Sequence, residues 1–393
     1  MALRNLFKLF SSEVLVVVLG LCVGVFVARA FGAEGKGLLA GTAAIVGLTV
    51  ALSSFGVSYS AVKLGGENTN RIMCLVALLG STISLLFLLG YQYYIFLPFD
   101  ISNNILKLYI LFFCSIYNLQ SLAFIVSRPS GNTYSVAIIC GQLISFIALS
   151  IMFFQTKLDP IWILLSTATV QFVVSFYYIE SVHVRELSNS VSSFKEYISS
   201  SFTQAPIIYL TSITIHIPIL LLSAESIFEA GLYAVAASSV LMIGKVPRLM
   251  HGMSLGGIMF HGKSVMVDFI KLQLFMVIVI IIFHALAAFL IEMLFGASFS
   301  GAVTPAVILA YSMLPLLFIS LAEGKLIVVK KYKSLIVCKA ISCLVLALLI
   351  FGVQLNLGEF NSISLAWCIL YFRLFSAIAI FCTTKWESVE VFG

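Results

Sequence analysis

Charged residues are scarce in this sequence. Lys, Arg, Asp and Glu make up 10% of its 393 residues, whereas a soluble domain carries about 25%. Hydrophobic residues reach 61% and the mean hydropathy is +1.14, which is more apolar surface than a water-soluble fold of this length could hide. The composition therefore excludes a soluble enzyme, a secreted domain, a nucleic-acid-binding protein and a disordered chain.

Motifs that bind metals or pair cysteines are also missing. The sequence contains no HExxH zinc motif, no CxxC pair, no Cys/His zinc spacing and no DxD-type acidic pair. All eight cysteines fall inside apolar runs, where they act as small hydrophobic residues. We therefore expect no disulfide framework, no metal and no cofactor, and we do not expect an enzyme.

Long apolar runs are what the sequence has instead. Its apolar residues, about 240, would fill about twelve spans at the roughly 20 residues that a spanning helix needs. We predict an all-α polytopic membrane protein, because lipid admits only helices or closed barrels and a barrel would show short alternating strands. The predicted spans are 12–30, 37–59, 72–96, 105–127, 133–154, 161–179, 204–222, 231–249, 272–295, 302–321, 334–354 and 362–384.

The first apolar run also resembles a secretory signal peptide, because Ala28-Arg29-Ala30 fits a cleavage site. We favour a spanning helix, since it completes an even number of spans and agrees with the charge bias. With the N-terminus in the cytoplasm, 17 of the 22 Lys and Arg fall on the cytoplasmic side, 4 on the outer side, and Arg373 inside the last span. By the positive-inside rule both termini are then cytoplasmic.

The predicted spans form two groups of six, at 1–180 and 204–393, joined by a polar, serine-rich linker at 181–203. Apolar residues recur at helical spacing in the linker, which predicts an amphipathic helix on the inner membrane surface. A partner-binding segment is the alternative.

A weak sequence repeat and four prolines give predictions about how the two groups of spans are arranged and where their helices bend. The pattern FGAxxxG occurs at 31–37 and again at 295–301, each at an outer helix end. Two six-helix halves in the same orientation would enclose a cavity between them. Kinks are expected at four prolines of the second half, as transport hinges or as static bends: Pro206, Pro218, Pro247 and Pro315.

Ionisable residues inside a membrane are candidate functional residues, because a central charge costs about 2.5–3.5 kcal/mol on insertion scales. Arg373 lies near the middle of the last span, and Arg29 closes the first. A planar, permanently charged guanidinium suits phosphate, so both are candidate substrate-binding residues; a structural pairing is the alternative. Lys245 and Arg248, at the inner end of the eighth span, are candidates for meeting an anionic lipid headgroup or are topology determinants.

Three further residues are candidates for ion coupling. His216 lies midway along the seventh span, His284 lies midway along the ninth, and Glu13 begins the first. A histidine in a span can exchange protons near neutral pH. The alternatives are buried, neutral, hydrogen-bonded histidines and an interfacial acid.

Two motifs resemble signatures of a known transporter family. The stretch VARAFGAEGKG at 27–37 resembles the signature that follows the first helix of polysaccharide-biosynthesis flippases, and EAGLYAVA at 229–236 resembles the signature that opens their eighth helix. The linker residues Phe194-Lys195-Glu196-Tyr197 also fit. The sequence thus resembles the Wzx-type O-antigen flippases of the multidrug/oligosaccharidyl-lipid/polysaccharide exporter superfamily.

The resemblance implies two six-helix bundles around a V-shaped central cavity. It implies translocation of an undecaprenyl-pyrophosphate-linked oligosaccharide, an O-antigen or capsule repeat unit, from the inner to the outer leaflet of a bacterial inner membrane. It implies alternating access coupled to an ion gradient, without ATP. Arg29 matches the arginine of the first signature, whereas His216 stands where members often carry an acid. A monomer is expected, with membrane lipids around it, no nucleic acid, and a polysaccharide polymerase as the candidate protein partner.

Two other functions stay open on the sequence. A cation-coupled small-molecule antiporter of the same fold would carry a cavity carboxylate in each half, for which Glu13 is the candidate found. A membrane glycan polymerase would carry a large outer loop with basic residues. The predicted outer loops are short and hold four Lys and Arg, which counts against a polymerase.

Overall fold

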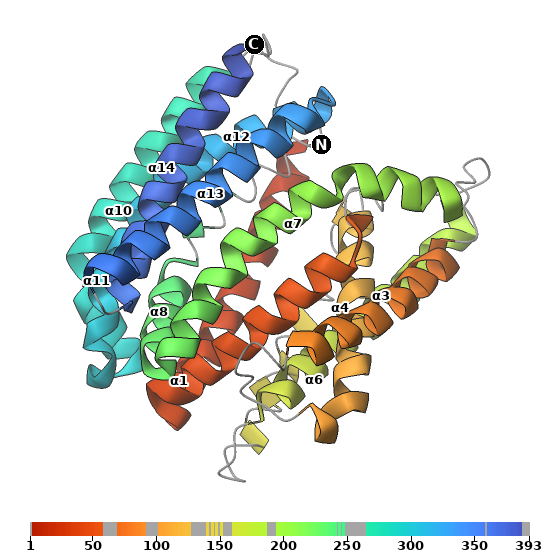
Figure 1. Ribbon diagram of the computed structural model, residues 1–393, viewed down its shortest axis with the longest axis horizontal. Coiled ribbons are helices and arrows are strands. Elements are labelled where there is room, and N and C mark those ends of the chain that lie inside the picture. The colour runs from red at the N-terminus through yellow and green to blue at the C-terminus, as the bar shows by residue number, and fades with distance from the viewer. Residues whose placement is uncertain are drawn as a thin grey trace. The chain divides into compact units, whose positions relative to one another are not determined.

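The computed structural model in Figure 1 describes residues 2–57, 69–91, 101–126, 139–140, 143–144, 146–147, 150–151, 159–186, 194–241, 243–244, 246–247, 265–357 and 360–386. Every regular element in these ranges is a helix, and eight of the helices are long and apolar enough to cross a membrane. The predicted all-α polytopic fold is therefore confirmed, and the chain is a multi-pass membrane protein. The predicted fifth span falls largely outside the described residues, so the number of twelve spans stays a prediction.

The chain divides into two compact units. Unit 1 holds residues 1–30 and 38–220, and unit 2 holds residues 31–37 and 221–393. The divisions therefore fall within α1 (Ala2–Ser53) and α7 (Phe194–Glu225), and not in the linker. The first ten residues of α7, 194–203, come from the predicted linker. The arrangement as two bundles of six helices, at 1–180 and 204–393, stays a prediction.

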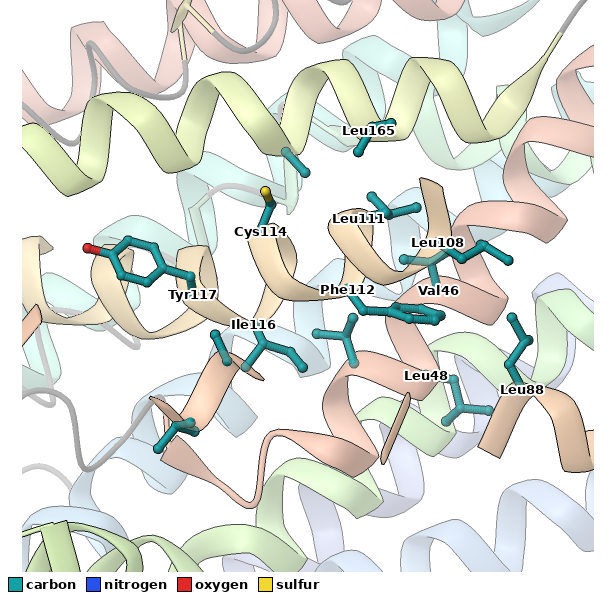
Figure 2. Close-up of a cluster of buried hydrophobic side chains, with 14 of the residues drawn as sticks. Val46, Leu48, Leu88, Leu108, Leu111, Phe112, Cys114, Ile116, Tyr117 and Leu165 are labelled. Carbon is teal, nitrogen blue, oxygen red and sulfur yellow. The ribbon is translucent and has the colours of Figure 1, made fainter. Parts of the chain in front are cut away.

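Unit 1 is built around α4 (Ile105–Val126), which packs between α3 (Thr69–Tyr91) and α6 (Pro160–Glu186). Figure 2 shows Leu108, Phe112 and other side chains of α4 in the buried cluster that also holds residues of α1, α3 and α6. Apolar packing of this kind supplies the contact surface on which helix association in lipid depends.

A polar group ties the start of α7 to the rest of unit 1. The Tyr197 hydroxyl donates to Gln120 Oε1 at 2.9 Å, and it lies 3.2 Å from the Val57 carbonyl oxygen. Burial raises the pKa of Tyr197, so the phenol stays protonated and able to donate. This residue belongs to the linker motif that resembles the flippases, and its role in unit 1 is that of an anchor.

Unit 2 is arranged around α14 (Ser362–Trp386). This helix packs against α8 (Ile227–Ser239), α11 (Val303–Tyr311), α12 (Met313–Val328) and α13 (Tyr332–Leu357), while α10 (Val265–Phe295) and the short η3 (Ala297–Ala302) pack beside α11. Leucine, isoleucine and phenylalanine side chains project outward from α10, where Leu274, Ile278, Ile281 and Phe289 are each more than half exposed. A face of that composition is what a spanning helix presents to lipid.

The two FGAxxxG segments share an unusual backbone conformation. Gly32 has φ 69° and ψ −169°, and Gly296 has φ 103° and ψ 163°. This region is essentially restricted to glycine. At Gly32 it kinks α1 between its two predicted spans, and at Gly296 it separates α10 from η3. The repeat therefore marks two sharp helix corners, both in unit 2.

The 31–37 corner and α8 approach each other backbone to backbone. A Cβ atom added at Gly37 would overlap the Ile227 carbonyl oxygen, and one added at Gly231 would overlap the Ala33 carbonyl oxygen. The contact is reciprocal, so both glycines are required for the same close approach. The contact explains why residues 31–37 of the first motif belong to the same unit as the second motif, almost 200 residues away in the sequence.

We expect Gly231→Ala to destabilise the protein, because the added methyl must push the Ala33 backbone away, at a cost typical of overpacking, about 1–3 kcal/mol. The matched control is Gly352→Ala on α13, where a Cβ meets nothing within 4 Å. The measurement is the temperature at which detergent-purified protein loses its monodisperse size-exclusion peak. The control should keep the wild-type temperature or exceed it. Equal thermal resistance of the Gly231 variant would contradict the close approach.

Candidate functional site

Arg373 lies near the midpoint of α14 and reaches the junction between α11 and α12. Its Nη1 donates to Ser312 Oγ at 2.6 Å and lies 3.5 Å from the sulfur of Met313. The Ser312 hydroxyl in turn donates to the Leu309 carbonyl oxygen at 2.6 Å. One hydroxyl therefore connects the guanidinium to the carbonyl end of α11.

Pro315 explains why the helix is broken at this level. Proline has no N–H, so the Tyr311 carbonyl cannot receive its usual bond from four residues ahead. The α-helix ends at Tyr311, and α12 begins at Met313. The last carbonyls of a helix carry a partial negative charge of roughly half an electron. Through the Ser312 hydroxyl, the break links Arg373 to the Leu309 carbonyl in the last turn of α11, inside a predicted span.

The partners of Arg373 differ from those of the paired lysines in the described ranges. Lys339 of α13 pairs with Glu323 of α12 at 2.6 Å, and Lys107 pairs with Asp159 at 3.6 Å. Arg373 has no carboxylate partner among the described residues. Its electrostatic neighbour is the buried phenol Tyr233 of α8. A guanidinium with neutral partners in an apolar setting is under-compensated, and it suits an anionic ligand.

The N-terminal end of α14 is held by a set of capping groups. Asn361 and Ser364 exchange backbone-to-side-chain hydrogen bonds of 2.9 Å in both directions, which is a capping box. The Glu229 carboxylate of α8 accepts the Ser362 N–H at 2.8 Å. A carboxylate at a helix N-terminus is favoured by the helix dipole. The second signature motif therefore contributes a cap to α14, through Glu229, as well as the phenol near Arg373.

The three ion-coupling candidates lie in different settings. His284 of α10 is exposed, and its Nδ1 is 2.8 Å from the Tyr311 hydroxyl at the end of α11. His216 of α7 covers Gly47 of α1 so closely that a Cβ there would lie 2.6 Å from its Nε2. His216 belongs to unit 1, whereas His284 and Arg373 belong to unit 2. The Glu13 side chain lies outside the described part, and its coupling role stays a prediction, as do those of the histidines.

The remaining predicted site residues are not brought to Arg373 by the described contacts. Arg29 is exposed on α1 and belongs to unit 1. Lys245 and Arg248 lie outside the described residues. Substrate binding by these three stays a prediction.

Sequence reasoning missed several residues around Arg373. The sequence prediction considered ionisable residues and therefore did not include the uncharged Ser312, Met313 and Tyr233. Pro315 was a signal in the sequence for the helix break. Lys36 is one of the four basic residues that the predicted topology puts on the outer side, and in the structure it is 8% exposed. The available signal was its place in Gly35-Lys36-Gly37, because Gly37 is packed against α8.

Two short stretches of the sequence fit motifs of soluble enzymes. Residues 252–256 read GMSLG, which fits GxSxG, and residues 257–264 read GIMFHGKS, which fits the spacing of a phosphate-binding loop. Both motifs work at a turn that follows a β-strand. The stretches lie outside the described residues, and the described positions just before them, 246–247, are helical. No function is assigned from these matches.

Comparison with solved structures identifies the fold. The chain is similar to a MOP superfamily transporter from Pyrococcus furiosus, with 11% identity over 99% of this chain and 95% of that chain and a TM-score of 0.70. It is similar to the lipid II flippase MurJ, with 15% identity over 96% and 87% of the two chains and a TM-score of 0.69. It is similar to MATE in complex with MaL6, with 10% identity over 99% and 95% and a TM-score of 0.68.

These likenesses extend over the whole chain at low identity, so they show the fold, which is that of MOP superfamily transporters. Neither a protein-family model nor a curated protein sequence matches the chain.

We expect Glu229→Ala to loosen the first turn of α14, because the Ser362 N–H loses its acceptor. Loss of a capping group costs about 1 kcal/mol, which corresponds to roughly fivefold faster exchange at that amide. The measurement is hydrogen–deuterium exchange of peptides covering 360–368. The control is Glu225→Ala, whose carboxylate accepts from the Gln354 side chain and not from α14. Unchanged exchange in the Glu229 variant, or an equal rise in both, would refute the cap.

Proposed function

We propose that the protein is a flippase that moves an undecaprenyl-pyrophosphate-linked oligosaccharide, an O-antigen or capsule repeat unit, from the inner to the outer leaflet of a bacterial inner membrane. The observation that carries the proposal is Arg373, a guanidinium near the midpoint of a spanning helix with a hydroxyl and a thioether as partners. The MOP fold, which the flippase MurJ shares, and the two signature motifs support the same function.

The chemistry of Arg373 favours a phosphate-bearing substrate. A guanidinium offers five N–H donors in a planar fork, and both described polar contacts of Arg373 use Nη1 alone. A pyrophosphate can accept the remaining donors in bidentate, charge-assisted hydrogen bonds. The sugars would contact polar side chains, and the prenyl chain would stay in the bilayer, because its transfer out of lipid is unfavourable.

Transport is proposed to proceed by alternating access driven by an ion gradient. Glu13, His216 and His284 are the candidates for coupling. His284 has the more informative position, because its Tyr311 partner lies next to Ser312, to which Arg373 donates. A bond to the last residue of α11 gives His284 a physical route to the same helix break. Arg29, Lys245 and Arg248 are proposed to guide the anionic headgroup.

A cation-coupled small-molecule antiporter is the second candidate, because MATE transporters share the fold. An antiporter that exchanges cationic compounds would need acceptor carboxylates, and the described surroundings of Arg373 hold a phenol, a hydroxyl and a thioether instead. The charge at Arg373 therefore favours an anionic substrate.

The test is complementation of a deletion strain of the encoding bacterium. Wild type should restore surface polysaccharide, and the deletion should accumulate lipid-linked repeat units on the inner leaflet. We expect Arg373→Ala to lower export at least tenfold, since hydrogen bonds to a charged group contribute about 1.5–3 kcal/mol. Arg373→Lys should recover part of the export, because it keeps the charge without the fork.

The matched control is Lys385→Ala, which removes an exposed cation from the last turn of the same helix and should export normally. Expression of all variants is compared by immunoblot. Surface polysaccharide that is unaffected by the deletion would reject the flippase and leave the antiporter. Full export by Arg373→Ala would remove Arg373 from the mechanism.

A further inference from the structure

The break between α11 and α12 is contacted by polar side chains from both flanking helices. From α10, His284 lies 2.8 Å from the Tyr311 hydroxyl, and Gln273 Nε2 donates to the Leu314 carbonyl oxygen at 3.2 Å. From α14, Arg373 donates to Ser312. Three polar groups thus converge on four consecutive residues, 311–314, where the helical hydrogen-bond pattern is interrupted.

The contacts from α10 and from α14 differ in kind. Those from α10 join an imidazole nitrogen to a hydroxyl and a side-chain amide to a backbone carbonyl. The contact from α14 joins a full positive charge to the negative end of α11 through the Ser312 hydroxyl. Because a helix end supplies only about half a charge, this partner compensates the guanidinium incompletely.

We infer that the carbonyl end of α11, presented through Ser312, is the counter-charge that Arg373 uses when no substrate is bound, and that an incoming pyrophosphate displaces it. The inference rests on the proposed function and adds a mechanism of response to the same site. The α11–α12 break senses whether Arg373 is occupied, because occupation removes the one charged contact that holds Ser312.

The exchange is favourable on simple electrostatic grounds. A pyrophosphate diester brings full negative charges and can engage two donors of the fork, whereas Ser312 offers one neutral oxygen. Once Arg373 has released Ser312, the break is held from α10 by two hydrogen bonds, and neighbouring Pro315 prevents the missing helical bond from forming. Substrate binding would therefore loosen residues 309–316, and the bend between α11 and α12 could change direction at that point.

Competition makes an unusual prediction for Ser312→Ala. If Ser312 were only a substrate ligand, its removal would weaken binding. If it competes with the substrate, its removal should tighten binding, by roughly tenfold for a contact of about 1.4 kcal/mol. The probe is farnesyl pyrophosphate added to the purified full-length protein, with farnesol as the uncharged control and binding followed by microscale thermophoresis.

The variants separate competition from a general effect of losing a hydroxyl. Ser312→Thr keeps the hydroxyl and should bind as wild type does. Ser342→Ala removes a buried hydroxyl from α13 and should also leave affinity unchanged. Arg373→Gln should abolish binding of the pyrophosphate without changing the response to farnesol.

A second measurement uses the wild-type protein alone and does not depend on the folding of any variant. Hydrogen–deuterium exchange of peptides covering 309–316 should rise at least twofold when farnesyl pyrophosphate binds, and farnesol should not raise it. Ser312→Ala, if folded, should show the faster exchange before any probe is added.

The outcomes distinguish the inference from the function on which it rests. Tighter binding by Ser312→Ala together with faster exchange on binding supports the sensor. Wild-type binding with slower or unchanged exchange at 309–316, or weaker binding by Ser312→Ala, overturns the sensor and leaves the flippase intact. Failure of the wild type to bind farnesyl pyrophosphate overturns both.

Discussion

An under-compensated positive charge in an apolar environment is the constraint around which unit 2 is organised. A guanidinium cannot give up its proton, so the surrounding structure must supply negative charge or accept a large cost. The described partners of Arg373 are a hydroxyl, a thioether and a nearby phenol. The Leu309 carbonyl near the end of α11 accepts from Ser312 and so supports the hydroxyl to which Arg373 donates. The break and the arginine are thus two parts of one arrangement.

The helix that carries Arg373 is positioned by the same motif that lies near its guanidinium. Glu229 caps the N-terminal end of α14, Gly231 permits backbone contact with the 31–37 corner, and Tyr233 interacts electrostatically with Arg373. These three residues occupy alternate positions in five residues of α8. The EAGLYAVA signature, in which most residues are small or apolar, therefore supplies a helix cap, a close backbone contact and a polar neighbour of Arg373. The 31–37 corner completes the set, because Gly32 adopts a conformation that other residues avoid.

The two units are connected through helices that belong partly to each unit. Units 1 and 2 exchange segments within α1 and within α7, so the chain passes between them inside helices and not only through the linker. The strained corner at Gly32 lies at one such passage.

Much of the architecture follows from composition and pattern. The scarcity of charge, the long apolar runs and the lysine and arginine bias predicted a multi-pass helical protein, because lipid excludes other backbones. Burial in a span marked Arg373 as a candidate, since a charge there is costly wherever it points. The FGAxxxG repeat was visible in the sequence, and the structure shows that each copy forms a helix corner. Lys245 and Arg248 were predicted to bind substrate only because they are charged. The charge of a residue does not tell which groups its side chain contacts in the fold.

The sequence by itself therefore determined which segments are apolar enough to lie in lipid, and at which positions a positive charge would cost free energy. Only the tertiary structure decided which groups lie next to the Arg373 guanidinium and compensate its charge. Ser312 and Tyr233 are uncharged and lie 61 and 140 residues from Arg373 along the chain, and Lys36 is buried beside a glycine that packs against α8. Hydropathy and charge are properties of single residues and short windows, whereas a counter-charge is a property of the distance between atoms on different helices.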